Sequence, residues 1–347
     1  MSATLKDIAR LSGSSLTTVS RVLNGSDYPV SEKLKNKILC AAEELNYTPD
    51  LVARSLKTKS GNEIAVITPS INNPYYTDII RSIEQEASLG GYGLLIYVTG
   101  KNGRESHELA LSLRGRRLAG ILIASDSVDD ALLKTLYLLK ESGTPVILFD
   151  YNLPQVTGLP GVFFDYEKGV AMATEYLLEN GHTKIAFAAG GLDRMSRKMR
   201  YDSFKAALLR KGVPFPEKYL LVSEREASFE AGVEMAEQLM KLEDRPTAVI
   251  GINDTVACGI LHYLVENHVS VPNEMSVIGF DNLIYSEMCY PSLTTIDVPT
   301  KEMGVFAIKK LFEEISGKSS DFNLLLLPTL VERKTVRCKK SEEKSML

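Results

Sequence analysis

Cysteine, histidine and long apolar runs are scarce in this 347-residue sequence. The four cysteines form no Cys-x-x-Cys pair, and no histidine lies at metal-ligand spacing from them. We therefore expect reduced thiols and no metal site. No apolar run reaches the roughly 18 residues of a membrane-spanning helix, and the first residues lack the apolar core of a secretory signal. These absences favour a cytoplasmic protein without a membrane partner.

The motifs of common enzyme classes are also missing. The sequence has no Gly-x-Ser-x-Gly and no His-Glu-x-x-His. Its one Gly-Lys-Ser, at Gly317–Ser319, has Phe312 where a phosphate-binding loop requires glycine. We expect no catalytic residue, no cofactor and no enzymatic activity.

The charge is distributed unevenly. The first sixty residues carry nine Lys and Arg against six Asp and Glu, whereas the whole chain has a net charge of −4. A basic N-terminal segment in an otherwise acidic chain suggests that only this segment contacts a polyanion.

The chain changes character after about sixty residues. The first part has the patterns of three helices: Thr4 and Asp7 resemble a capping box, the turn at Ser12–Ser14 is expected to cap the second helix, and Ser31 begins a third. From Ile64 onward, buried-strand runs alternate with helices, which predicts parallel βαβ units in two doubly wound subdomains. The predicted organisation is a helix-turn-helix domain (1–48), a hinge helix and linker (49–62), a core (63–338) and a charged tail (339–347). Within the core, we expect a first subdomain of about residues 63–160 and 292–322, and a second of about residues 161–291 and 323–338.

The short helix within residues 14–25 has two contrasting faces. Val19, Val22 and Leu23 form its apolar stripe, and Thr17 and Arg21 lie together on the polar side. In a helix-turn-helix, such a second helix enters the DNA major groove. Arg can donate to guanine, Thr to a base or phosphate, and Leu can pack on a thymine methyl group. The alternative is an ordinary solvated helix face.

The segment that follows suits the minor groove. Val52 and Leu56 share a face, flanked by Arg54, Lys57 and Lys59. An apolar wedge between cations can separate a base step and bend the duplex. A plain linker is the alternative.

Blocks spread over the whole chain resemble the LacI/GalR family of bacterial transcription regulators. They are TLKDIARLSGSSLTTVSRVLNG, VSEKLKNKILCAAEELNYTPDLVARSLKT, GINDTVACGIL, MSVIGFDN and PSLTTIDVP. The resemblance implies a core like the periplasmic sugar-binding proteins and a homodimer on a pseudo-palindromic double-stranded DNA operator. The DNA-contact positions that it implies are Ser15, Leu16, Thr17, Thr18, Arg21, Asn24, Tyr47, Val52, Ala53 and Leu56.

The effector is expected between the core subdomains, beyond the carboxyl ends of the strands. Aromatic, amide, carboxylate and Arg side chains at these ends suit a polyhydroxylated ligand, so we expect a sugar or sugar derivative. Ala227 stands where many family members have an aromatic residue, so the site lacks one of the rings on which a standard hexose would stack. The candidate effector contacts are Tyr75, Tyr76, Ser125, Asp150, Phe164, Ser196, Arg200, Asn253 and Asp281.

Three other functions compete with an effector-responsive repressor. A periplasmic solute-binding protein would carry a signal peptide and no helix-turn-helix, and an enzyme would need catalytic motifs. A regulator of the catabolite-control type would respond to a phosphoprotein corepressor instead of a sugar. The last residues contain no leucine heptad of the kind that makes tetramers in some family members, so we expect a dimer.

Overall fold

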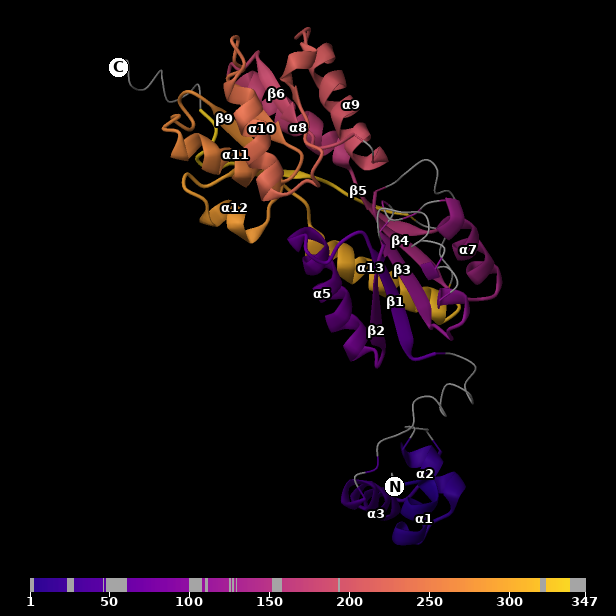
Figure 1. The fold of residues 1–347 in the computed structure, drawn as a ribbon. Helices are drawn as coiled ribbons and strands as arrows, with labels where there is room; N and C mark the ends of the chain where they lie inside the picture. Colours follow the sequence, from indigo (N-terminus) through magenta and orange to yellow (C-terminus); the bar gives the residue numbers. More distant parts are fainter. Residues whose placement is uncertain are drawn as a thin grey trace. The chain divides into compact units, whose positions relative to one another are not determined.

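The described residues form two compact units, Met1–Ser60 and Gly61–Leu347 (Figure 1). Among the helices described, none is long and apolar enough to cross a membrane. The computed structural model describes residues 3–23, 28–45, 47, 61–99, 108–109, 112–124, 126, 128, 130–151, 158–192, 194–318 and 323–337.

The first unit contains three helices around a small apolar core. They are α1 (Leu5–Ser12), α2 (Leu16–Leu23) and α3 (Glu32–Glu44). One buried side chain from each of α1 and α2 and two from α3 meet in this core, which is formed by Ile8, Val19, Ile38 and Ala41. Short helices are marginal alone in water, so this shared core is what stabilises them.

The helix ends follow the sequence signals with one difference. The capping box is confirmed, because the Thr4 N–H donates to Asp7 Oδ2 at 3.0 Å. Gly13 ends α1 in the left-handed conformation, with φ of 66°. The expected cap at Ser12–Ser14 is wrong by one residue, since Ser15 Oγ accepts the Thr18 N–H at 3.1 Å. Ser14 instead shares a hydrogen bond with Ser12 at 2.8 Å.

Two six-stranded sheets form the second unit, and the predicted α/β class is confirmed. Their strand orders are β11-β5-β4-β3-β1-β2 and β12-β10-β9-β8-β6-β7, with parallel pairing throughout except between β10 and β12. The central strands are buried on both faces, as expected where helices cover a parallel sheet. The strands are β1 (Glu63–Thr68), β2 (Gly93–Val98), β3 (Gly120–Ala124), β4 (Val146–Asp150), β5 (Gly161–Phe164), β6 (Ile185–Ala188), β7 (Leu220–Leu221), β8 (Ala248–Gly251), β9 (Ser276–Asp281), β10 (Thr294–Asp297), β11 (Leu324–Leu326) and β12 (Thr329–Val331).

Helices pack against both sheets. In the first subdomain α5 and α13 lie side by side, as Figure 1 shows, and in the second α10 packs along α11. The helices are α5 (Pro74–Leu89), α7 (Asp130–Glu141), α8 (Tyr166–Glu179), α9 (Met195–Arg210), the short 3₁₀ helix η2 (Glu217–Tyr219), α10 (Phe229–Met240), α11 (Asp254–Glu266), α12 (Ile284–Met288) and α13 (Thr300–Ile315).

The subdomain boundaries differ from the predicted ones. Strand β5 pairs with β4 and β11, so both β5 and β11 belong to the first sheet, whereas they were expected in the second subdomain. Strand β10 pairs with β9 in the second sheet and was expected in the first. The chain therefore changes sheets after β5, β10 and β11. Strand pairing is a non-local choice, so the order of strands along the sequence does not determine which sheet each of them joins.

Candidate functional site

The polar face of α2 is exposed, as the sequence predicts. Val19 is fully buried in the core of the first unit, which turns the opposite face outward. Leu16 has 45% of its surface exposed although it is apolar. Thr17 and Arg21 are exposed beside it, together with Ser15. An exposed Leu among hydrogen-bonding side chains is suited to direct readout of base edges.

Arg21 is held over an aromatic ring. Its guanidinium carbon lies 4.0 Å from the centroid of the Tyr28 ring. This cation–π contact limits the directions in which the Arg21 fork can point. Tyr28 therefore joins the candidate DNA-contact surface as a residue that positions Arg21.

The other predicted DNA contacts are placed only in part. Tyr47 is half-buried against the core of the first unit, and Thr18 is half-buried with its hydroxyl 2.8 Å from that of Ser15. The residues predicted to contact DNA or effector that lie outside the described part of the chain are Asn24, Val52, Ala53, Leu56 and Ser125.

A cleft in the second unit brings together side chains from both subdomains. It has a volume of 130 Å³. From the first subdomain it is lined by the first turn of α5 and the end of β4, and from the second by α9 and the ends of β8 and β9. The predicted effector contacts that line it are Tyr75, Tyr76, Asp150, Ser196, Arg200, Asn253 and Asp281.

Asp150 is the polar centre of the first-subdomain wall. Tyr75 OH donates to its Oδ1 at 2.7 Å, Tyr76 OH donates to its Oδ2 at 3.0 Å, and Tyr166 OH donates to Oδ1. Pro74 opens α5, and Asn73 Oδ1 accepts the Tyr75 N–H at 3.1 Å, which fixes the turn that carries both of its tyrosines. Burial raises the pKa of Asp150 to about 6, although the hydrogen bonds from Tyr166 and Tyr75 act to lower it.

Arg200 is the cation of the opposite wall. Its guanidinium carbon lies 4.2 Å from the ring centroid of Tyr166 and 4.4 Å from that of Phe280, and one Nη donates to the carbonyl of Ile252. Its Nε is buried and has no hydrogen-bond partner among the described residues. Asp281 ends β9 with φ of 113°, and burial raises the pKa of its carboxyl well above the usual value, despite the nearby charge of Arg200.

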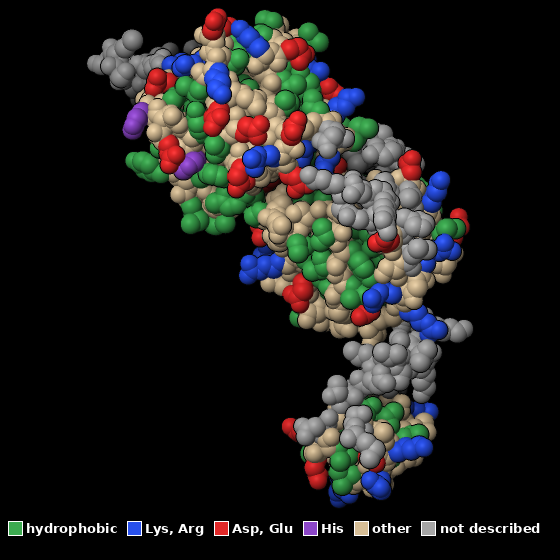
Figure 2. Space-filling view, in the orientation of Figure 1, with side chains coloured by type: hydrophobic (Ala, Val, Ile, Leu, Met, Phe, Trp, Pro, Cys, Tyr) green, Lys and Arg blue, Asp and Glu red, His purple; other side chains and the backbone are tan. Residues whose placement is uncertain are grey.

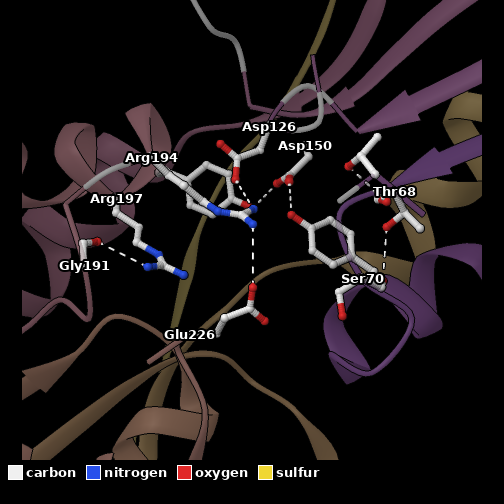
Figure 3. Close-up of polar contacts among 11 residues, drawn as sticks. Thr68, Ser70, Asp126, Asp150, Gly191, Arg194, Arg197 and Glu226 are labelled. Carbon is white, nitrogen blue, oxygen red and sulfur yellow. Dashed lines mark hydrogen bonds and ion pairs between the residues drawn. The ribbon is translucent and has the colours of Figure 1, made fainter. Parts of the chain in front are cut away.

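Arg194 links the two walls (Figure 3). Its Nη1 lies 3.3 Å from Oδ2 of Asp126, in the first subdomain, and its Nη2 lies 4.0 Å from Oε1 of Glu226, in the second. The Asp126 side chain is only 9% exposed, so this ion pair is largely shielded from water. Arg194 therefore holds the two subdomains together beside the cleft.

Three residues at or just after strand ends have structural tasks. Asn253 Oδ1 accepts the Val256 N–H at 2.9 Å and so caps α11, while its Nδ2 donates to the carbonyl of Ala227 at 3.5 Å. Asp165 caps α8 through the Lys168 N–H. Phe164 does not line the cleft with the other predicted contacts; it packs edge-on against Tyr166, with ring centroids 4.8 Å apart.

Comparison with known proteins identifies both units. Residues 4–50 match the model of the bacterial regulatory proteins of the lacI family, and residues 174–336 match that of the periplasmic binding protein-like domain. The HTH-type transcriptional repressor PurR of Vibrio parahaemolyticus is 34% identical over 338 residues, which cover 96% of this chain and 99% of the relative. The chain belongs to the LacI family.

Other relatives agree with this assignment. Catabolite control protein A of Priestia megaterium is 31% identical over 96% of this chain and 98% of its own length. A crystal structure of the Lac repressor dimer bound to operator and the anti-inducer ONPF matches with a TM-score of 0.85 and 28% identity, over 96% of this chain and 99% of that one. A complex of the transcriptional regulator CelR with cellobiose matches with a TM-score of 0.70 and 27% identity, over 96% and 99%.

The LacI-family chain is thus a DNA-binding transcriptional regulator and not an enzyme. Sequence reasoning missed several residues of its cleft, which include Tyr151, Tyr166, Arg194 and Arg197. Tyr166 follows a strand end by two residues, and both arginines lie in the loop and first turn after β6. Position after a strand end was therefore a usable signal for all three. No group of three metal-ligating side chains lies together within the described residues.

Proposed function

We propose that this protein is a cytoplasmic, homodimeric repressor whose operator affinity is set by a small molecule bound between the core subdomains. The observation that best supports an effector site here concerns the side chain of Arg200. Its Nε is buried in the cleft wall without a partner among the described residues, and Asp281, Asp150 and Ser196 line the same space. A buried donor of this kind is costly unless an acceptor reaches it, which a ligand oxygen would do.

A sugar or sugar derivative is the effector class that this lining suits best. Carboxylates, an arginine and an amide offer the paired donors and acceptors that neighbouring hydroxyls need, and the cleft walls contain tyrosine rings. The cellobiose complex of the similar regulator CelR supports the same class. Ala227 lines the cleft at the position where an aromatic wall was expected, so a ligand other than a standard hexose is favoured.

On the DNA side, Leu16, Thr17 and Arg21 are proposed to read base edges in the major groove, with Ser15 and Thr18 near phosphates. The segment with Val52, Ala53 and Leu56 is proposed to fold as a hinge helix in the minor groove. The effector would act by favouring one of two relative orientations of the subdomains, because a ligand shifts an equilibrium only through its differential affinity.

An apolar surface supports the dimer. Ile284, Met288 and Tyr290 are 71%, 76% and 88% exposed, on α12 and just after it. Figure 2 shows apolar side chains gathered over this part of the second subdomain. Clustered apolar exposure of this kind marks protein contacts in soluble proteins. The Lac repressor dimer on its operator provides the model for such an assembly.

A thermal-shift screen with a panel of sugars and sugar phosphates tests the effector class. One ligand should raise the unfolding temperature of the wild-type chain, and Arg200→Gln should abolish that rise. Lys198→Gln, an exposed change on the same helix, should leave the rise intact. A panel without any stabilising sugar would contradict the proposed class.

A second candidate keeps the regulator and replaces the sugar by a phosphoprotein corepressor. The observation that favours it is the volume of the cleft around Arg200, 130 Å³, which is small beside the roughly 300–1,000 Å³ of typical ligand pockets; a second pocket, of 510 Å³, shares Ala227 with it. Similarity to catabolite control protein A is compatible with it. A phosphoprotein that co-purifies with the chain and raises its operator affinity would favour this candidate over a sugar.

A further inference from the structure

Two cysteines of the second subdomain are in direct contact. The Sγ atoms of Cys258 and Cys289 lie 3.0 Å apart, although 31 residues separate them in the chain. Cys258 lies on α11 and is buried, and Cys289 directly follows α12 and is half-buried. Both are free thiols. Their contact is therefore produced by the packing of two helices and not by a local motif.

A second contact fixes the same pair of helices. The hydroxyl groups of Thr255 and Tyr285 are hydrogen-bonded to each other, about one turn before Cys258 and Cys289 respectively. A disulfide bond has an S–S length of about 2.05 Å, so the two sulfurs need to approach by only about 1 Å. The packing of α11 and α12 thus places the thiols close to bonding geometry.

The thiols also face open space. A pocket of 510 Å³ lies between the subdomains and is lined by both cysteines, Phe229, Tyr285 and Asn73. A small oxidant can enter a pocket of this size. The two sulfurs differ in character: their mutual contact lowers the pKa of the Cys289 thiol and raises that of the Cys258 thiol. Cys289 is also the more exposed thiol, half-buried where Cys258 is buried, so an oxidant in the pocket reaches it first, and its thiolate is the reactive form.

We propose that Cys258 and Cys289 form a peroxide-reactive dithiol site, in which Cys289 attacks the oxidant and Cys258 resolves the product. The Cys289 thiolate attacks one oxygen of hydrogen peroxide, the O–O bond breaks and hydroxide departs, so that Cys289 becomes a sulfenic acid. The hydroxide takes up the proton that the Cys289 thiol released on ionising and becomes the first water. The Cys258 sulfur then attacks that sulfur, the S–O bond breaks, and water leaves. Two thiols and one peroxide thus become one disulfide and two waters.

The bond would connect two elements that begin at the effector cleft. Asn253 caps α11, and α12 follows closely after Asp281. A covalent link between α11 and the segment after α12 would therefore restrain the second-subdomain wall of the cleft. Oxidation would thus restrain the effector cleft, although neither cysteine lines it.

Peptide mapping of the full-length protein tests this site directly. Wild-type protein is treated with hydrogen peroxide, blocked with N-ethylmaleimide, digested and analysed by mass spectrometry with and without dithiothreitol. We expect a cross-linked peptide pair containing Cys258 and Cys289 that has lost two hydrogens and separates on reduction. The oxidised protein should unfold about 5 °C or more above the reduced one, and dithiothreitol should reverse that rise.

Single variants test the order of attack. In Cys258→Ser, dimedone should trap a sulfenic acid on Cys289, whereas Cys289→Ser should show several-fold less trapping on Cys258. Cys40→Ser, which removes an exposed thiol of the first unit, should leave the cross-link unchanged. The proposal is overturned if Cys258 and Cys289 both carry N-ethylmaleimide after peroxide treatment of the wild type, or if either bonds instead to Cys40, Cys338 or a second copy. These outcomes are read on the wild-type protein, so the test does not depend on whether a variant folds.

Discussion

Arg194 Nη1 lies 3.3 Å from Asp126 Oδ2, and this ion pair joins the second subdomain to the first beside the cleft. Because Asp126 is largely shielded, we assign the pair about 0.5–1 kcal/mol, the upper part of the range for surface ion pairs. We predict that Arg194→Gln increases hydrogen exchange about two- to five-fold in the segments that line the cleft, measured by mass spectrometry. Lys198→Gln makes the same charge change on exposed α9 surface and should leave the exchange unaltered. Equal exchange in the two variants would contradict a bridging role.

The tyrosine cage around Asp150, formed by the hydroxyls of Tyr75, Tyr76 and Tyr166, should stabilise the fold in a pH-dependent way. Tyr76→Phe removes the hydroxyl that donates to Asp150 Oδ2 at 3.0 Å. A hydrogen bond to a buried charge contributes about 1.5–3 kcal/mol. The pKa of Asp150 is about 6, so the carboxyl is charged at pH 8 and mostly protonated at pH 5. The loss in the free energy of unfolding should therefore be larger at pH 8, as measured by urea denaturation.

The control for this cage is Tyr290→Phe. Tyr290 is 88% exposed and lies outside the cleft, so its hydroxyl should matter little at either pH. A loss for Tyr76→Phe that is the same at pH 5 and pH 8 would show that the charge of Asp150 is not what the hydroxyl stabilises.

Asp254 should make the protein less stable as the pH rises through the acidic range. Its carboxylate accepts the Leu283 N–H at 2.7 Å and the Thr295 hydroxyl at 2.6 Å, but burial raises its pKa to about 7 in the fold. The unfolded value is 3.8, so between pH 4 and 7 the folded state binds the extra proton, and the free energy of unfolding falls as pH rises.

The measurement is the free energy of unfolding against pH for Asp254→Asn and the wild type. The variant lacks this titration, so its profile between pH 4 and 7 should be flatter, by up to about 1.4 kcal/mol per pH unit. Asp202→Asn, at a half-exposed position on α9, should keep the wild-type slope. Parallel profiles for Asp254→Asn and the wild type would refute the assignment.

The apolar surface at α12 is expected to support the dimer. Ile284→Asp places a charge on a side chain that is 71% exposed in the single chain, so folding should tolerate it. At a protein interface the same buried charge is costly. We predict that sedimentation velocity shows mostly monomer for Ile284→Asp. Leu209→Asp, at a position 79% exposed on α9, should remain a dimer. A stable tetramer of the wild type would contradict the dimer itself.

Local patterns were sufficient for most of the architecture. The apolar stripe of α2 predicts its buried Val19 and exposed polar face, because helical periodicity is a local property. Buried strand runs predict two parallel sheets for the same reason. The sheet membership of β5 and β10 was wrong, since pairing depends on contacts between distant strands.

The cleft was predicted less completely than the fold. The strand-end rule correctly brings Asp150 and Asp281 to one cleft. It misplaced Phe164, because the Phe164 ring packs edge-on against Tyr166 and does not line the cleft. The cation–π contact of Arg21 with Tyr28 was also missed. Such side-chain partners depend on rotamers and on packing between separate elements, which spacing in the sequence does not encode.

Selection of DNA sites from a random pool by the full-length chain tests the central claim most directly. We predict a consensus of two inverted half-sites, because a symmetric dimer presents two copies of α2. Arg21→Ala should relax the preference at one base pair of each half-site, and Leu56→Ala should weaken specific binding far more than non-specific binding. Recovery of sequences without any shared motif would contradict the proposed operator-binding repressor.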